Sequence, residues 1–372
     1  MLTSFWKCQQ NLNSLVLIKE KTLEKQSVAN QKAEIEFRKK LVLQQIDGEN
    51  FLKDEFDARS IEDILANRMQ KTQKQMTMLT DQQISLSPYL EIGAERCQRS
   101  LVMENDICAT GIAADISYDM LRACDYYKEV FTKSNIPVRV CCDVNNLPFA
   151  TDSIPFLFCY ETLHHFPNPS PVVKEVHRVL LPGGYFFFDE EPYKQNLHAH
   201  LYKKRIHAGG ARNRNIIIKI LDYFFSETTC NEVDHGIIEN HQISVKLWKH
   251  ALEPFDEKNV TLNSVRIIRS ELFDPSSYTN YLLAYLLGGN ISGLCKKSGN
   301  LVQKTDSIYN LLVCPSCREM NDDIKLERKD TFFACPKCGK VFPVVEGIVF
   351  LFSYNKLEEL YPEIFKNLSN LL

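Results

Sequence analysis

Short apolar runs alternate with amphipathic stretches along residues 84 to 190. Amphipathic stretches such as 118–135 and 169–180 place their apolar residues at helical spacing. Short apolar runs between such stretches are typical of strands in a parallel sheet. The five runs are 88–93, 109–117, 136–143, 154–160 and 184–190. The alternation predicts an α/β fold with a doubly wound, Rossmann-like sheet, whose ligands bind at the carboxyl ends of the strands.

The flanking regions have different patterns. Residues 1–84 are rich in Lys, Glu and Gln and repeat apolar residues at helical spacing, so we expect a helical N-terminal region. Beyond residue 190 the pattern is less regular. The expected elements there are helices over 193–207 and 216–227, a strand over 260–272, a helix that ends at Gly288, and a C-terminal helix over 354–372.

Composition and charge narrow the function classes. The net charge is -3 and the pI is near 6.3, so any contact with nucleic acid or a membrane surface must come from a local basic face. No run approaches the roughly 20 apolar residues that a spanning helix needs. We therefore expect a cytoplasmic protein. The most basic stretch, 201–219, is either a solvated helix face or a mobile lid for an anionic substrate.

Several motifs follow the predicted strands in order. The first strand ends in Glu91, Ile92 and Gly93, and a glycine there permits a tight turn that exposes backbone amides to a ligand. Asp115 ends the next strand about 20 residues later, the interval at which this fold places an acid on ribose hydroxyls. The later elements are Asp143, Leu147-Pro148-Phe149, Leu163-His164-His165 and Pro182-Gly183-Gly184.

This ordered set resembles the class I S-adenosylmethionine-dependent methyltransferases over roughly residues 85–192. The resemblance implies a methyltransferase domain over 85–310, in which 191–300 hold a substrate-covering insertion and the last strands. It also places Asp143 beside the adenine amino group and Val144 near the adenine edge. The cofactor-binding residues that it implies are Glu91, Gly93, Ala94, Asp115, Ile116, Asp143, Val144 and Tyr160.

The chain departs from the family in the turn after the first strand. Glu95 and Cys97 stand where glycines are usual. Glu95 brings a negative charge near the carboxylate of the cofactor, and like charges a few ångström apart repel by about 1 kcal/mol in water. We expect Arg96 and Arg99 to offset this charge.

Methyl transfer from a sulfonium is an in-line displacement, so alignment and exclusion of water are the main tasks of the protein. An oxygen or nitrogen acceptor also loses a proton, and an imidazole suits this step near neutral pH. The candidate catalytic residues are His164 and His165, with Glu161 or Tyr160 as the orienting partner. The alternative is a pair of histidines of which one is packed and one is solvated.

Four of the 13 cysteines form two matched Cys-Pro-Xaa-Cys pairs. They are Cys314 with Cys317 and Cys335 with Cys338, the spacing of a tetrahedral, structural Zn²⁺ site with four thiolate ligands. Residues 311–353 resemble the zinc-ribbon activator subunit of tRNA, rRNA and release-factor methyltransferases. The resemblance implies an activator that works in cis and a possible protein partner through the ribbon. Direct RNA contact through the basic residues of the ribbon is the alternative.

The leading prediction is an S-adenosylmethionine-dependent methyltransferase that acts on an oxygen or nitrogen of a small molecule, such as a biosynthetic intermediate. An RNA or translation-factor methyltransferase is the second reading. The acidic pI disfavours it, as does the sequence LHHFPNP in place of an Asn-Pro-Pro-Tyr motif. The third reading is a non-catalytic scaffold with this fold. Glu95 and Cys97 support it, as does Pro155, which with Ile154 stands where the family tends to have Phe-Asp. The retained Gly93, Asp115 and Asp143 argue against it.

Overall fold

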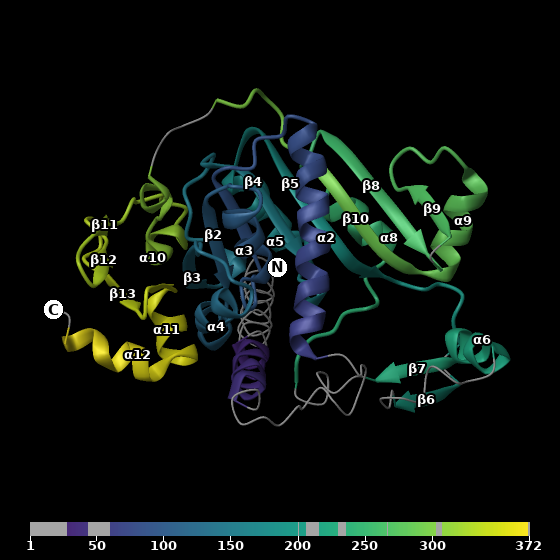
Figure 1. The fold of residues 1–372 in the computed structure, drawn as a ribbon, viewed down its shortest axis with the longest axis horizontal. Coiled ribbons are helices and arrows are strands. Elements are labelled where there is room, and N and C mark those ends of the chain that lie inside the picture. Colours follow the sequence, from purple (N-terminus) through teal and green to yellow (C-terminus); the bar gives the residue numbers. More distant parts are fainter. Residues whose placement is uncertain are drawn as a thin grey trace, which may run out of the picture.

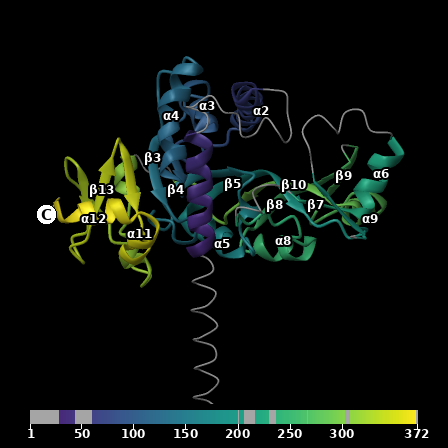
Figure 2. The same cartoon turned by 90° about the horizontal axis from the view of Figure 1, so that it is seen from below.

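The computed structural model describes residues 28–43, 60–199, 201–205, 216–229, 236–265, 267–302 and 307–370. A long mixed sheet runs through this part of the chain (Figure 1). Helices α2, α3 and α4 cover one face of the sheet, and α5 and α8 cover the other (Figure 2). Because the central strands are parallel, their carboxyl ends lie together between these two layers of helices, and the candidate site lies at those ends.

The central strands form the predicted α/β sheet. They are β1 (Tyr89–Ile92), β2 (Gly111–Asp115), β3 (Val138–Cys142), β4 (Ile154–Tyr160) and β5 (Leu180–Tyr193). They pair in parallel in the order β3-β2-β1-β4-β5. Strands β1, β2 and β4 are buried along their whole length, as expected for a sheet covered on both faces. The doubly wound, Rossmann-like prediction is therefore confirmed.

Helices follow these strands as the polar pattern predicts. Ser117 caps α4 by accepting a hydrogen bond from the Met120 amide, and α5 buries a stripe of four valines against the sheet. The α-helices around the central strands are α2 (Ile61–Asp81), α3 (Gln98–Asn105), α4 (Tyr118–Val130) and α5 (Ser170–Val179), with a further helix over residues 28–43. Residues 1–27 and 44–59 of the predicted helical region 1–84 lie outside the described residues.

Antiparallel strands extend the sheet beyond β5. They are β10 (Gly289–Lys296), β8 (Glu257–Ser264) and β9 (Ile268–Glu271), accompanied by α8 (Val245–Ala251) and α9 (Tyr278–Leu287). The predicted strand 260–272 is thus two strands joined by a turn. Helix α9 ends at Gly288, as predicted, because this glycine adopts a left-handed φ of 71°.

The segment after β5 differs from the sequence prediction. A helix over 193–207 is wrong, because β5 itself continues to Tyr193 and β6 (Tyr202–Arg205) pairs with β7 (Ser226–Thr229). Helix α6 (Ile216–Phe225) falls within the predicted helix 216–227. The misassigned segment has apolar residues at helical spacing, but pairing between strands more than 20 residues apart overrides that local pattern.

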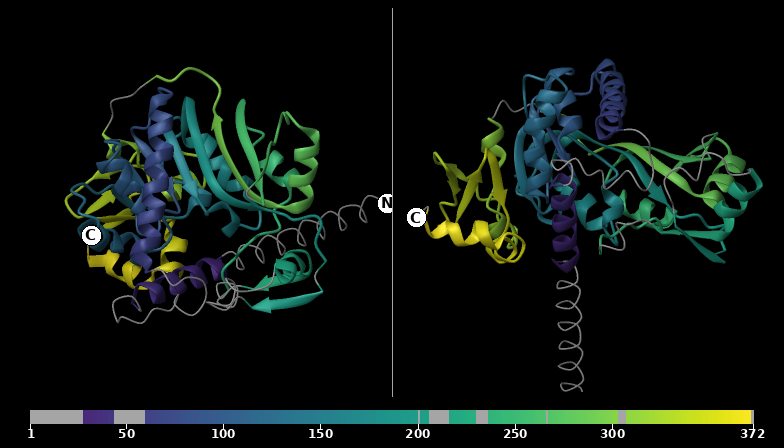
Figure 3. Two further views of the ribbon diagram at one scale, coloured as in Figure 1. Left: turned by 45° about the vertical axis from the view of Figure 1, so that its right-hand side comes forward. Right: turned by 60° about the horizontal axis from the view of Figure 1, so that its bottom comes forward.

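The C-terminal segment joins the same sheet from the opposite edge. Its elements are η4 (Ile308–Leu311), α10 (Pro315–Arg318), β11 (Glu327–Arg328), β12 (Phe332–Ala334), β13 (Val341–Val345) and β14 (Ile348–Leu351). Strand β14 pairs in parallel with β3, from Ile348 opposite Arg139 to Leu351 opposite Cys142. The whole order is β11-β12-β13-β14-β3-β2-β1-β4-β5-β10-β8-β9, and Figure 3 shows the C-terminal segment against the β3 side of the molecule.

The chain ends in short helices beside β13 and β14. In place of one helix over 354–372 there are α11 (Tyr354–Leu360), α12 (Pro362–Lys366) and η5 (Asn367–Asn370). Pro362 accounts for the break, because proline cannot donate the backbone hydrogen bond that would continue α11. The two helices keep the chain close to β14, and their side chains reach the carboxyl ends of β2 and β3.

Candidate functional site

A cavity of about 740 Å³ lies at the carboxyl ends of the parallel strands. Its volume is within the range of about 300–1,000 Å³ typical of small-molecule sites. The wall includes seven residues predicted from the sequence: Gly93, Asp115, Ile116, Asp143, Val144, Glu161 and His165. Four other predicted residues are buried outside this lining set: Glu91, Ala94, Tyr160 and His164.

The turn after β1 has the positive φ angles typical of glycine, although only one of its residues is a glycine. Gly93 has a φ of 67°, and Glu95 and Cys97 also lie in the left-handed region, at 46° and 58°. Such a conformation costs a residue with a side chain on the order of 1–3 kcal/mol, so the surrounding structure must hold it. A Cβ at Gly93 would lie 2.3 Å from Thr162 Oγ1, so a side chain at this position would force Thr162 to move.

The charge of Glu95 is neutralised by the N-terminal helices. Arg38 Nη1 lies 3.2 Å from Glu95 Oε1, and Arg68 Nη1 lies 3.0 Å from Glu95 Oε2. Burial alone would raise the pKa of Glu95, but Arg68 and Arg38 outweigh it and hold the pKa well below its usual range. The expected residues, Arg96 and Arg99, contribute more weakly to this lowering. Sequence reasoning missed the two arginines that make the direct contacts.

Asp115 lies in the cavity wall beside the turn. Its Oδ2 accepts a hydrogen bond from the Glu95 amide at 2.8 Å, and its Oδ1 accepts one from the Ser117 amide at 2.8 Å. Burial raises the pKa of Asp115 to about 6, although both hydrogen bonds act to lower it. The carboxyl group is therefore mostly ionised at neutral pH, and two backbone amides hold it in the cavity wall at the end of β2. Its role as an acceptor of ribose hydroxyls stays a prediction.

Asp143 occupies the end of β3, where the C-terminal segment meets the cavity. Its Oδ1 accepts hydrogen bonds from the Asn145 amide and side chain, both at 2.9 Å, and Lys356 forms an ion pair with its Oδ2. Burial would raise the pKa of Asp143, but Lys356 and Asn145 outweigh it and lower the pKa. At the end of β2, Tyr361 Oη donates to Ile116 O at 2.6 Å. The C-terminal helices thus hold two strand ends of the predicted cofactor site.

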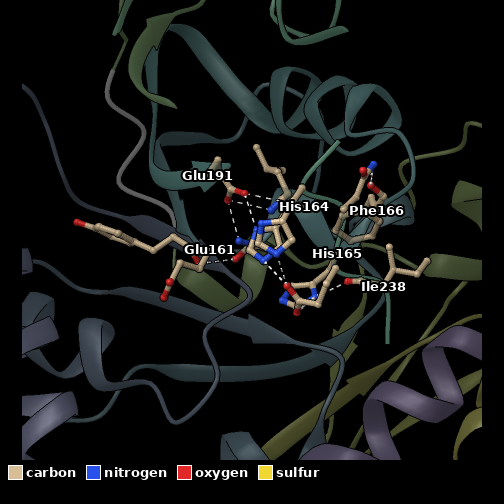
Figure 4. Close-up of polar contacts among 12 residues, drawn as sticks. Glu161, His164, His165, Phe166, Glu191 and Ile238 are labelled. Atoms are coloured by element: carbon tan, nitrogen blue, oxygen red, sulfur yellow. Dashed lines mark hydrogen bonds and ion pairs between the residues drawn. The ribbon is translucent and has the colours of Figure 1, made fainter. Parts of the chain in front are cut away.

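The two histidines differ in their surroundings, as Figure 4 shows. His164 is buried, with Nδ1 3.0 Å from Glu191 Oε2 and Nε2 3.2 Å from Glu239 Oε2. Burial would lower the pKa of His164, but the hydrogen bonds to the two glutamates raise it to about 10. An imidazolium held in this way cannot accept a proton at neutral pH. His165 lines the cavity, and its Nδ1 lies 3.0 Å from Ile238 O.

The predicted orienting partners contact other groups. Glu161 lines the cavity and pairs with Arg68 Nη2 at 2.8 Å. Tyr160 donates from its hydroxyl to Gln75 Oε1 at 2.8 Å, and Arg99 stacks 4.2 Å from its ring centre. Among the described residues, neither Glu161 nor Tyr160 forms a hydrogen bond with a histidine. Glu191 and Glu239 hold the histidines instead.

Sequence reasoning missed two parts of the cavity wall. The helix over 28–43 contributes Asn30, Gln31, Glu34 and Arg38, and a segment just before α8 contributes Ile238, Glu239 and Asn240. The one local signal in the first part is the spacing of Glu34 and Arg38, which form an ion pair one helical turn apart at 2.6 Å. Such pairs are common on solvated helices, so the spacing alone does not indicate a site.

The four cysteines of the C-terminal segment come together. Cys314 Sγ and Cys338 Sγ lie 3.6 Å apart, and Cys317 Sγ and Cys335 Sγ lie 3.8 Å apart. Sulfur atoms about 2.3 Å from a tetrahedral Zn²⁺ are about 3.8 Å from one another. The donor set and its spacing therefore fit a zinc ion with no open coordination position.

Comparison with known proteins finds matches in the central part of the chain. Residues 90–188 match the family model of a methyltransferase domain. Two Arabidopsis thaliana proteins described as uncharacterised chloroplastic methyltransferases are 37% identical over 91 residues and 36% identical over 78 residues. These matches cover 23% and 20% of this chain, and 25% and 22% of the relatives. The chain thus spans about a quarter of the length of each relative, and the comparison supports a methyltransferase domain over 90–188.

Solved structures are similar at a lower level. A complex of the Haloferax volcanii Trm112 methyltransferase activator with a protein described as a methyltransferase aligns with a TM-score of 0.38 and 15% identity, covering 64% of this chain and 94% of that chain. A Haemonchus contortus phosphoethanolamine N-methyltransferase bound to S-adenosylmethionine gives a TM-score of 0.37 and 11% identity, covering 57% and 49%. These TM-scores are too low to transfer a function.

No helix among the described residues is both long enough and apolar enough to span a membrane.

Proposed function

We propose that this chain is an S-adenosylmethionine-dependent methyltransferase that acts on a small molecule. The observation that carries the proposal is the cavity at the strand ends, in which Gly93, Asp115 and Asp143 lie in the wall behind three consecutive strands. The bound cofactor would supply the methyl group from its sulfonium. The protein would hold the cofactor, align the acceptor and exclude water.

The cavity wall fits the cofactor at several points. The turn at Gly93 suits the methionine part, Asp115 suits the ribose hydroxyls, and Asp143 with Val144 suits the adenine. Gln31 adds a buried Oε1 without a hydrogen-bond partner among the described residues, which favours a polar ligand in this cavity. The arginines on Glu95 argue against the scaffold alternative, because they neutralise the charge that would repel the cofactor.

We place the methyl acceptor beside His165 and Glu161, the two predicted catalytic residues that line the cavity. An oxygen or nitrogen acceptor fits this polar end. His164 has a positioning role in this proposal, since it holds Glu191 and Glu239 in place. We expect His165→Ala to reduce turnover by about 10²–10⁴-fold while the affinity for S-adenosylmethionine stays unchanged. Equal turnover in the variant and the parent protein would remove His165 from the reaction.

The zinc ribbon supports the methyltransferase domain of its own chain in this proposal. Strand β14 pairs with β3, and the helices that follow reach Asp143 and Ile116. Zn²⁺ held by the four cysteines would fix the positions of the two Cys-Pro-Xaa-Cys turns that precede β14. A separate protein partner that binds the ribbon stays a prediction.

Isothermal titration of the full-length chain with S-adenosylmethionine tests the cofactor site. We expect one equivalent to bind, and Asp115→Asn to weaken binding because a charge-assisted acceptor is lost. Asp274→Asn serves as the matched control, since Asp274 is exposed and lies outside the cavity. No specific heat of binding with the folded parent protein would favour the scaffold alternative.

A further inference from the structure

A second group of metal-binding side chains lies at the acceptor end of the cavity. His164, His165 and Glu239 each offer a ligand atom, and these atoms lie within 4.8 Å of one another. Glu239 Oε2 is 3.2 Å from His164 Nε2, and Glu239 Oε1 is 3.3 Å from His165 Nδ1. Figure 4 shows His164 and His165 side by side, with Ile238 near His165. The centres of the two imidazole rings are 4.5 Å apart.

These separations match the spacing of metal ligands. Nitrogen and oxygen ligands about 2.0–2.1 Å from a tetrahedral Zn²⁺ lie about 3.3–3.4 Å from one another. In the same way, the separations between the sulfur atoms of the cysteine cluster agree with the longer Zn–S distance of about 2.3 Å. The separation of each imidazole nitrogen from Glu239 is therefore close to a ligand-to-ligand distance, with one carboxylate oxygen facing each histidine, and the three ligand atoms as a set lie within 4.8 Å.

The surroundings of His164 also fit a metal ligand. Its Nδ1 bonds to Glu191, a carboxylate that is completely buried and also accepts the Thr162, Leu163 and His164 amides. A carboxylate in this position is common behind metal-binding histidines, because it fixes the ring and directs Nε2 toward the ion. His164 Nε2 points to Glu239, which is where the ion would lie.

We propose that His164, His165 and Glu239 bind a divalent transition metal ion such as Zn²⁺ at the acceptor end of the cavity. His165 Nδ1 would exchange its contact with Ile238 O for the ion, and the ion would replace the proton between His164 and Glu239. Three protein ligands leave a coordination position, and His165 and Glu239 face the cavity. This arrangement is typical of catalytic rather than structural zinc.

A role for this ion in methyl transfer rests on the proposed function, although metal binding does not. An acceptor hydroxyl that binds the open position would lose its proton to solvent more easily, as water does on zinc. Its oxygen would then form a bond to the methyl carbon as the bond between that carbon and the cofactor sulfur breaks, and the sulfur would keep the electron pair. The acceptor would then be an oxygen nucleophile, and His165 would act as a ligand of the metal rather than as a free base.

Metal content of the full-length, zinc-saturated protein tests the proposal directly. After dialysis against metal-free buffer and addition of Zn²⁺, we expect two bound metal ions per chain. A protein given one equivalent of Zn²⁺ and then one equivalent of Co²⁺ should show a visible absorption spectrum from Co²⁺ in the second site. This spectrum should lack thiolate-to-metal charge transfer, because the second site contains no cysteine. One metal ion per chain in the parent protein at saturating Zn²⁺ would overturn the proposal.

Variants assign the second ion to these residues. Glu239→Gln and His165→Asn should each reduce the content from two ions to one, whereas His250→Asn should keep both, since His250 is exposed and pairs with Glu253 at a distance from the cavity. His165 is partly exposed, so its variant remains informative if Glu239→Gln does not fold. A second ion that persists in folded His165→Asn and Glu239→Gln would place the site elsewhere.

The same proteins separate this inference from the proposed function. Loss of the second ion in Glu239→Gln with unchanged S-adenosylmethionine binding is the expected result. Metal binding without any cofactor binding would contradict the proposed function and support the metal site. Cofactor binding with only one metal ion per chain in the parent protein would support the proposed function and contradict the second metal site.

Discussion

The two ends of the cavity are built in different ways. At the proposed cofactor end, Gly93, Asp115 and Asp143 each follow a strand, so the parallel sheet itself brings them together. At the proposed acceptor end, His165 meets Glu239 from a segment more than 70 residues away, and Glu34 of the N-terminal helix lines the same cavity. The difference teaches that the order of the parallel strands alone brings together the residues of the proposed cofactor end, whereas the other end depends on how segments far apart in the chain pack.

The largest expected effect concerns the ribbon, whose strand β14 pairs with β3 and whose following helices contact Asp143 and Ile116. Cys335→Ser should reduce metal content by one ion per chain and lower the melting temperature strongly, because structural zinc contributes about 10–16 kcal/mol of apparent binding free energy in zinc fingers. S-adenosylmethionine affinity, measured by calorimetry, should fall with it.

Cys108→Ser is the matched control for this test, since Cys108 is exposed and outside the zinc cluster. Unchanged cofactor affinity in Cys335→Ser, together with the loss of one ion, would show that the two domains act independently.

Gly93→Ala should disrupt the turn at the cofactor end. The added Cβ would lie 2.3 Å from Thr162 Oγ1, and the residue has a left-handed φ of 67°. We expect a loss of about 2–4 kcal/mol in the free energy of unfolding and a large loss of cofactor affinity. Chemical denaturation measures the first effect and calorimetry the second.

Gly339→Ala separates the two causes, because Gly339 has a φ of 71° but no atom within 4 Å of its Cβ position. It should cost about 1–2 kcal/mol. Equal losses in both variants would mean that the clash with Thr162 relaxes.

Arg38→Ala should leave the charge of Glu95 partly uncompensated beside the cofactor carboxylate. We expect S-adenosylmethionine to bind about tenfold more weakly, which corresponds to about 1.4 kcal/mol. The double variant Arg38→Ala with Glu95→Gln should recover most of this loss, and Lys39→Ala, on the exposed side of the same helix, should cause none. Additive effects in the double variant would show that Arg38 acts by packing and not by its charge.

The last expected effect is a pH dependence at Asp115, similar in size to the effect of Arg38→Ala on cofactor affinity. Burial raises its pKa to about 6, and the ionised form accepts hydroxyl hydrogen bonds, so cofactor binding should be complete above pH 7 and lost as the pH falls through 6. Binding at pH 5 should be about tenfold weaker than at pH 7.5. Calorimetry at both values measures it, and a similar decrease in Asp115→Asn would assign the effect to another group.

Stability without cofactor should change in the opposite direction. The folded chain binds the Asp115 proton more tightly than the unfolded chain, so this group lowers the free energy of unfolding as the pH rises from about 4 to about 6. Asp115→Asn should remove that contribution, which chemical denaturation at several pH values can detect.

The sequence predicted the parallel strands and the order of the residues that follow them, because both depend on short-range patterns. The same local reasoning assigned a helix to 193–207, where pairing between β6 and β7 prevails. It also named Arg96 and Arg99 as the partners of Glu95, whereas Arg38 and Arg68 make the contacts. Contacts made across large sequence separations leave no periodic signal in either segment.

The sequence by itself determined the α/β class, the strand ends that line the cavity and the four cysteines of the ribbon, since each is encoded in residues close together in the chain or in matched pairs. Only the tertiary structure decided that β14 extends the sheet beside β3, that helix 28–43 closes the cavity wall, and that Glu239 lies between His164 and His165. The physical reason is that these contacts depend on how separate elements pack, which local spacing does not specify.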